Sequence, residues 1–115
     1  FEGQMYPSVE HAYQAAKTLD LDERRRIALL KRPGDAKRAG KYLTLRADWT
    51  EAKLKVMEEL LRCKFANEAL RKKLRATAGM LIMEGNTWGD TYWGTYDGKG
   101  DNHLGKLLMK VRTEL

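Results

Sequence analysis

The chain has 115 residues and a mass of 13.2 kDa, which fits one domain that buries its own hydrophobic core. Its composition, 43% hydrophobic and 33% charged, is typical of a globular protein, and its apolar runs are too short for the roughly 20 residues of a membrane span. A net charge of +6 favours phosphate-bearing partners. The single cysteine excludes a disulfide within the chain. Together with the lack of a recognisable signal segment, it predicts a cytoplasmic protein.

The first half of the chain predicts helices separated by short breaks. Ser8 is a favourable N-cap for a helix over residues 9–17, and Asp22 is a candidate cap for the helix that follows. A short basic helix is expected over residues 36–43. Asp48 has a glutamate three residues later, which is capping-box spacing, and the helix after it carries the clearest apolar stripe in the sequence.

The second half mixes helices with a predicted sheet. Asn67 can cap a helix that ends near Gly79, and Asn102 is a candidate cap for the last helix. Residues 80–84 form a short apolar run bounded by glycines, which predicts a buried strand, and a second strand is expected around residues 91–94. We therefore expect an α+β fold, a predominantly helical single domain with a small β-sheet.

Positive charge is concentrated between residues 22 and 41. This segment holds eight lysines and arginines against three acids. Such an excess attracts phosphate groups on nucleic acids, nucleotides or sugar phosphates. It is also the composition of an ordinary solvated helix surface, and the charge pattern alone favours that interpretation.

Glycine and aromatic residues are concentrated in residues 88–102. Asp90 lies between Trp88 and Trp93, and six of the ten glycines fall between residues 85 and 105. Glycine loses the most backbone entropy on ordering, so this loop suits a ligand site better than a core. Tryptophan faces stack on flat rings, and a carboxylate near an anomeric carbon can activate water. Taken alone, each tryptophan is by default a packing residue.

A polar stripe runs along the first predicted helix. Glu10, Gln14 and Lys17 lie at positions i, i+4 and i+7, so they share one face. These side chains can line a polar cleft or face solvent, and spacing alone favours solvent. His11 and His103 have no second ligand at metal spacing, and the chain contains neither HExxH nor CxxC, so we expect no metal site.

Six sequence blocks resemble, in order, the signature blocks of the NADAR family, also called YbiA-like. The blocks are YPSVEHAYQAAK at residues 6–17, AKRAG at 36–40, RADW at 46–49, KF at 64–65, WGDTYWG at 88–94 and GDNHLGKLLM at 100–109. The resemblance extends over nearly the whole chain and implies a single NADAR domain with a YbiA-like fold. Members of the family usually carry a further N-terminal segment with an aromatic Ser-Asn-Phe type motif, and we expect this chain to lack it.

The resemblance implies an N-glycosidase that needs no metal or organic cofactor. The implied substrates are phosphoribosylamino-pyrimidine intermediates of riboflavin biosynthesis, cleaved to ribose 5-phosphate and a free pyrimidine, or ADP-ribose attached to guanine in DNA or RNA. A non-catalytic module that binds nucleotides or nucleic acid is the alternative outside enzymes. No membrane partner is expected, and the sequence leaves the oligomeric state open.

The resemblance also implies roles for individual residues. Glu10, Lys17 and Asp90 become the candidates for catalysis, either by carboxylate-assisted hydrolysis or through a Schiff base on Lys17. Tryptophans are expected to stack on the substrate rings or to form the pocket wall, and basic residues to hold phosphate. The candidates for substrate binding are Gln14, Lys37, Arg38, Arg46, Trp49, Trp88, Trp93, Asn102 and Lys106. For Asn102, capping of the last helix and binding of sugar hydroxyls are both open.

Overall fold

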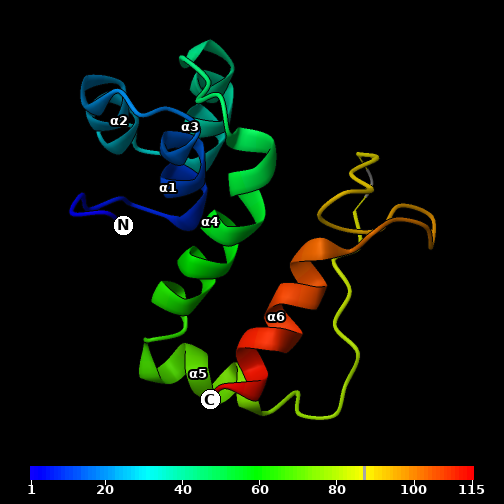
Figure 1. Cartoon of the computed structure of the whole chain (residues 1–115). Helices are drawn as coiled ribbons and strands as arrows, with labels where there is room; N and C mark the ends of the chain where they lie inside the picture. Colours follow the sequence, from blue (N-terminus) through cyan, green and yellow to red (C-terminus); the bar gives the residue numbers. More distant parts are fainter. Residues whose placement is uncertain (87) are drawn as a thin grey trace. The chain divides into compact units, whose positions relative to one another are not determined.

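The structure, a computed structural model, describes residues 1–86 and 88–115 (Figure 1). Its helices are α1 (Val9–Ala16), α2 (Leu21–Ala28), α3 (Pro33–Ala39), the 3-10 turn η1 (Gly40–Tyr42), α4 (Trp49–Lys64), α5 (Glu68–Arg75) and α6 (His103–Thr113). The chain forms two compact units, Phe1–Leu60 and Leu61–Leu115, and α4 passes from one to the other. Of the helices described, none is long and apolar enough to cross a membrane.

The predicted β-sheet is absent from the described residues, so the prediction of an α+β fold class is wrong. Residues 80–84 are not a strand, and three of their five side chains are exposed. Residues 91–94 are mostly bends. Within the described part of the chain the pairing is limited to two isolated bridges, Gly85 with Thr95 and Tyr96 with Lys99. The fold is therefore helical, with a long irregular connection between α5 and α6.

The expected strand does not form because a side chain, rather than a second strand, pairs with its backbone. The Asn102 carboxamide accepts a hydrogen bond from the Glu84 N–H at 2.9 Å and donates one to the Ile82 carbonyl at 2.9 Å. The Glu84 carbonyl accepts a hydrogen bond from the Thr95 N–H at 2.6 Å. These contacts satisfy polar backbone groups that a strand would pair in a ladder. Apolar periodicity carries no information about such partners, so it predicted a strand here.

Side-chain caps decide where several helices begin. Ser8 and Asn67 each accept a hydrogen bond from a backbone N–H in the first helical turn at 3.2 Å, so both predicted caps are confirmed. Asp22 is not the cap of α2, because Asp20 precedes the helix and accepts hydrogen bonds from two backbone N–H groups. Pro33 is the first residue of α3, where its fixed φ suits a helix, so this basic helix begins earlier than predicted.

Small residues let the helices of the first unit pack closely. Ala15 of α1 and Ala36 of α3 are fully buried, and Ile27 of α2 is 2% exposed. Helices approach one another more closely when the side chains at the contact are short. Figure 1 shows α1, α2 and α3 gathered in this unit, where α1 contacts both of the others. The packing places the C-terminal end of α3 against the polar side of α1.

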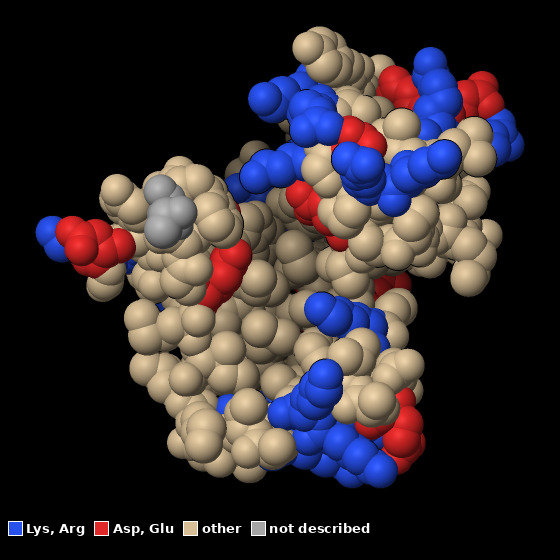
Figure 2. Space-filling model, turned by 180° about the vertical axis from the view of Figure 1, so that it is seen from behind, with Lys and Arg blue, Asp and Glu red and all other residues tan. Residues whose placement is uncertain are grey.

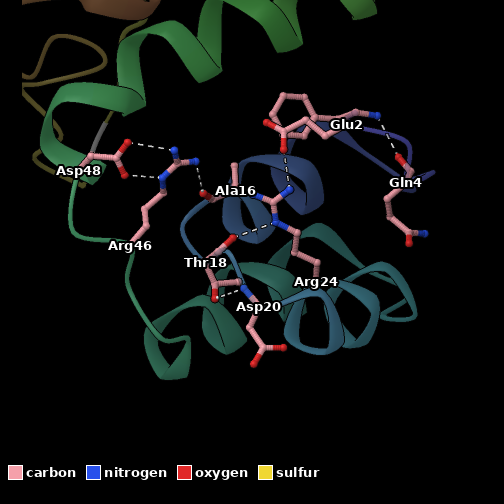
Figure 3. A network of polar contacts seen from close by, with 9 residues as sticks. Glu2, Gln4, Ala16, Thr18, Asp20, Arg24, Arg46 and Asp48 are labelled. Atoms are coloured by element: carbon pink, nitrogen blue, oxygen red, sulfur yellow. Dashed lines mark hydrogen bonds and ion pairs between the residues drawn. The ribbon is translucent and has the colours of Figure 1, made fainter.

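A buried arginine ties the start of the chain to this unit (Figure 3). Arg24 is 5% exposed and donates from Nε to the Thr18 carbonyl at 2.8 Å and from Nη1 to Glu2 at 2.8 Å. Glu2 has a φ of 47°, which is uncommon for a residue other than glycine. A buried guanidinium needs such partners, because an uncompensated charge is costly away from water. The contacts therefore hold the residues that follow α1 in place.

Candidate functional site

The predicted stripe on α1 forms a connected set of polar side chains. Glu10 lies in the first turn of α1, and Lys17 is the C-cap residue. Gln14 donates a hydrogen bond from Nε2 to Glu10 Oε1 at 3.4 Å. Gln14 is only 4% exposed, so the stripe does not simply face solvent. The structure thus brings a carboxylate, an amide and an amine together on one helix face.

The Lys17 ammonium is destabilised by its surroundings. Burial is the largest effect and lowers the pKa of Lys17 from its usual value, while the Glu10 carboxylate raises that pKa and the Lys37 ammonium lowers it. The net direction is downward. A larger fraction of Lys17 is therefore the neutral, nucleophilic amine near neutral pH than for an ordinary lysine. Lys37 belongs to α3, and no spacing in the sequence links it to Lys17.

The Tyr13 ring lies beside this amine, and the Trp49 ring packs against Tyr13. The Lys17 Nζ is 5.6 Å from the centroid of the Tyr13 ring. The Tyr13 ring lies 5.3 Å from the Trp49 ring, with an angle of 60° between their planes. Trp49 is partly exposed and is the first residue of α4. The predicted binding residue Trp49 therefore shares a neighbourhood with the stripe on α1, and a stacking role for it stays a prediction.

Arg46, a candidate for phosphate, has protein partners in this structure (Figure 3). It pairs with Asp48 through hydrogen bonds of 2.6 and 3.0 Å and donates to the Ala16 carbonyl at 3.5 Å. Its backbone N–H donates to the Lys17 carbonyl at 2.7 Å. These contacts fix the C-terminal end of α1, where Lys17 lies.

The basic surface of the first unit is partly neutralised by its own acids. Figure 2 shows lysines and arginines gathered over this unit with acids among them. The ion pairs include Arg24 with Glu2, Arg25 with Asp22, and Arg38 with Asp35. Arg38 was a candidate for phosphate, and its partner competes for that role. Lys37 is exposed and lies close enough to lower the pKa of Lys17, so it is the better placed candidate for phosphate.

In the second unit, Asp90 orders the glycine-rich loop. Its Oδ1 accepts hydrogen bonds from the backbone N–H groups of Tyr92 at 3.0 Å and Trp93 at 2.9 Å. The Asn86 side chain accepts from the Asp90 N–H at 3.0 Å and donates to the Asp90 carbonyl at 2.8 Å. Gly89 has a φ of 81°, a conformation that favours glycine. The carboxylate of Asp90 therefore has a structural role, and its catalytic role stays a prediction.

The charge of Asp90 can be separated experimentally from this structural role. Asp90→Asn keeps Oδ1 as an acceptor, so we expect an unchanged Tm, with turnover lowered by about 100-fold through loss of a positioned carboxylate. Asp90→Ala also removes the acceptor and should lower Tm. Thermal unfolding and steady-state kinetics of the two variants make the comparison. Normal turnover of Asp90→Asn would assign Asp90 to loop structure alone.

The loop tryptophans differ in their surroundings. Trp88 is 64% exposed, so its ring is available for stacking on a ligand. Trp93 is partly buried and packs edge-on against Tyr92, with ring centroids 4.9 Å apart and planes at 83°. Tyr92 in turn lies 4.4 Å from the His103 ring. Lys106 is exposed on α6. Of the two loop tryptophans, Trp88 has more of its ring open to a ligand.

Asn102 holds the connection before the loop rather than capping α6. It occupies the N-cap position of α6, as predicted, with a φ of 54°, but its side chain makes no cap hydrogen bond, so the prediction of a side-chain cap is wrong. The side chain is nearly buried, because both amide atoms bond to the backbone of Ile82 and Glu84. Binding of sugar hydroxyls by Asn102 stays a prediction.

Loss of the Asn102 carboxamide should destabilise the second unit. Asn102→Ala removes the hydrogen bonds to the Glu84 N–H and the Ile82 carbonyl, and we expect a loss of about 2–4 kcal/mol in the free energy of unfolding. Asn67→Ala is the matched control, because it removes an exposed helix cap worth about 1 kcal/mol. Chemical denaturation measures both. Equal losses in the two variants would contradict the bridging role of Asn102.

The predicted site residues divide between the two units. The first unit contains Glu10, Gln14, Lys17, Lys37, Arg38, Arg46 and Trp49. The second contains Trp88, Asp90, Trp93, Asn102 and Lys106. Within the first unit, Lys37 lowers the pKa of Lys17 and Trp49 packs against Tyr13 of α1. Within the second, Asp90 and Asn102 organise the backbone around the loop. In the described part of the chain, no group of three or more His, Cys, Asp and Glu side chains is placed to hold a metal ion.

Comparisons with known proteins match nearly the whole length of the chain, and they indicate one family. The model of the NADAR domain matches residues 1–115. The N-glycosidase YbiA of Escherichia coli (strain K12) is 42% identical over 118 residues, which cover 99% of this chain and 73% of that protein. The riboflavin biosynthesis protein PYRR, chloroplastic, of Zea mays is 36% identical over 124 residues, which cover 96% of this chain and 20% of that protein. The NMR structure of E. coli YbiA is similar with a TM-score of 0.87 at 41% identity, covering 98% of this chain and 69% of that one.

Proposed function

This chain belongs to the NADAR family and is an N-glycosidase, and we propose that it hydrolyses phosphoribosylamino-pyrimidine intermediates of riboflavin biosynthesis. The proposed products are ribose 5-phosphate and the free pyrimidine. The maize relative supports this substrate class, because its name refers to riboflavin biosynthesis. One observation carries the proposal: Glu10 and Lys17 share a face of α1, and the pKa of Lys17 is lowered. A carboxylate can carry protons and a neutral amine can attack the sugar carbon, so these two groups suit the cleavage of a sugar–nitrogen bond.

In the proposed mechanism Lys17 is the nucleophile. Opening of the ribose ring turns the C1–N bond of the substrate into an imine. The neutral Lys17 amine adds to C1, both protons of that amine pass in turn to the pyrimidine nitrogen, and the bond from C1 to the pyrimidine breaks to release the aminopyrimidine. The resulting imine between Lys17 and ribose adds water, which regenerates the amine and releases ribose 5-phosphate. Glu10 carries protons between these atoms as the general acid and base.

A route without a covalent step relies on a carboxylate, for which Glu10 and Asp90 are the candidates. The carboxylate would stabilise the positive charge that develops at C1 and activate a water molecule. The lowered pKa of Lys17 favours the amine route, because an ordinary lysine is almost wholly protonated at neutral pH. In either route Lys37 is the proposed partner of the sugar phosphate, since it is exposed beside Lys17.

Product analysis with a trapping reagent tests the activity and the route together. The protein is incubated with freshly prepared phosphoribosylamino-pyrimidines, with and without borohydride, and released ribose 5-phosphate is measured by mass spectrometry. We expect release of the sugar, and with borohydride a reduced sugar adduct on the peptide that contains Lys17. Release without an adduct would leave the carboxylate route, and no release would exclude this substrate class.

ADP-ribose on guanine in DNA or RNA is the second candidate substrate, and the exposed basic surface of the first unit favours it (Figure 2). A polymer that displaces several counterions binds much more weakly as salt rises, whereas a small sugar phosphate is less affected. Turnover of both substrates between low and physiological salt therefore distinguishes them. Tight binding of single strands with no released base would instead support a non-catalytic binding module.

A further inference from the structure

The Gln14 carboxamide has one atom in an unfavourable environment. Its Oε1 is buried, and no donor among the residues that the structure describes lies within hydrogen-bonding distance of it. A buried acceptor without a partner costs free energy and needs an explanation. Turning the amide over would place Oε1 against the Glu10 carboxylate, which can only accept hydrogen bonds. The orientation that leaves Oε1 unpaired is therefore the one that gives Glu10 a donor.

Gly40 makes room for this orientation. A Cβ atom on Gly40 would overlap Gln14 Oε1 and lie 2.8 Å from Gln14 Cδ. The backbone itself does not require glycine, because the φ of −57° and ψ of −24° at Gly40 are ordinary helical values. The space occupied by the Gln14 side chain is thus the physical reason for a glycine at this position.

We propose that Gln14 and Gly40 are positioning residues that hold the Glu10 carboxylate in its working orientation. The proposal rests on the proposed function of Glu10. Gly40 admits the Gln14 amide, and the amide donates to Glu10 Oε1 at 3.4 Å. Hydrogen bonds in catalytic sites are often long without substrate and shorten when it binds. Without this donor the carboxylate would be drawn toward the Lys17 ammonium, which would keep the nucleophile protonated.

The test compares two glycines at opposite ends of α3. Gly40→Ala displaces the Gln14 amide, and we expect kcat to fall by about 10- to 100-fold with little change in KM. Gly34→Ala is the matched control, because a Cβ there has only the tip of Arg38 within contact, at 3.7 Å. Its kcat should stay at the wild-type value.

A double-mutant cycle shows whether the effect passes through Gln14. We expect Gln14→Ala to lower kcat as Gly40→Ala does, and the double variant to be no slower than Gln14→Ala alone. Alanine also suits the helical backbone better than glycine, so the double variant should have a Tm at or above that of Gln14→Ala. A merely structural role of Gly40 would instead give additive losses in kcat.

Each outcome separates this inference from the proposed function. If the wild-type protein releases no sugar from either substrate, the proposed function fails. If the wild type turns over and Gly40→Ala keeps its kcat, or still lowers kcat when Gln14 is alanine, the positioning role is overturned. If Gly40→Ala does not fold, Gln14→Met supplies the same test with Gly40 in place, since methionine fills the space but has no N–H to donate. A normal kcat for Gln14→Met would also overturn the proposal.

Discussion

Glu10→Gln is expected to lower kcat by about 1,000-fold while the protein stays folded. Glutamine has the size of glutamate and still offers an oxygen to Gln14 Nε2, so the contact along α1 is kept. The ability to carry a proton is lost. Glu10 raises the pKa of Lys17, so its replacement lowers that pKa further and leaves more neutral amine. The fall in kcat therefore cannot be assigned to a protonated nucleophile, and the residual rate should extend to lower pH.

The control for Glu10 is another glutamate in the first turn of a helix. Glu68 occupies that position in α5, so Glu68→Gln causes the same loss of charge at a helix N-terminus, worth about 0.3–1 kcal/mol in stability. We expect the two variants to lose similar Tm and only Glu10→Gln to lose turnover. Equal turnover in both variants and the wild type would remove Glu10 from the proposed chemistry.

Local signals in the sequence correctly predicted two helix caps and the polar stripe on α1, because these features depend only on residues close together along the chain. Ser8 and Asn67 cap their helices because the cap, the turn and the first N–H groups are all within a few residues. The stripe of Glu10, Gln14 and Lys17 follows from helical spacing in the same way.

The prediction of a sheet was wrong because its outcome depends on distant partners. A strand was expected at residues 80–84 because the apolar run resembles one, yet the groups that satisfy its backbone belong to Asn102 and to the loop. The approach of Lys37 to Lys17 depends on two alanines that let α1 and α3 pack closely, and the need for Gly40 depends on Gln14. No periodicity in the sequence reports such contacts.

Lys17→Met is expected to lower kcat by about 10,000-fold or more and to abolish the borohydride adduct, because the nucleophile itself is removed. The fold should not suffer. Burial lowers the pKa of Lys17, which means that the folded protein disfavours the ammonium. The unfolded chain then binds more protons than the folded one between the lowered pKa and 10.5, so wild-type stability rises with pH across that window. Lys17→Met should lack this rise and match or exceed the wild-type Tm at neutral pH.

Lys37 provides the complementary test, because it acts on the same amine through its charge. Lys37→Met removes one cause of the lowered pKa of Lys17, so that pKa rises and the increase of kcat with pH moves to more alkaline values. Lys31→Met removes an exposed charge from the segment between α2 and α3 and should leave the kcat profile in place. A shift in KM alone for Lys37→Met would limit Lys37 to holding the phosphate. A shift in the pH profile of kcat would tie the rate to the protonation of Lys17, which the carboxylate route does not require.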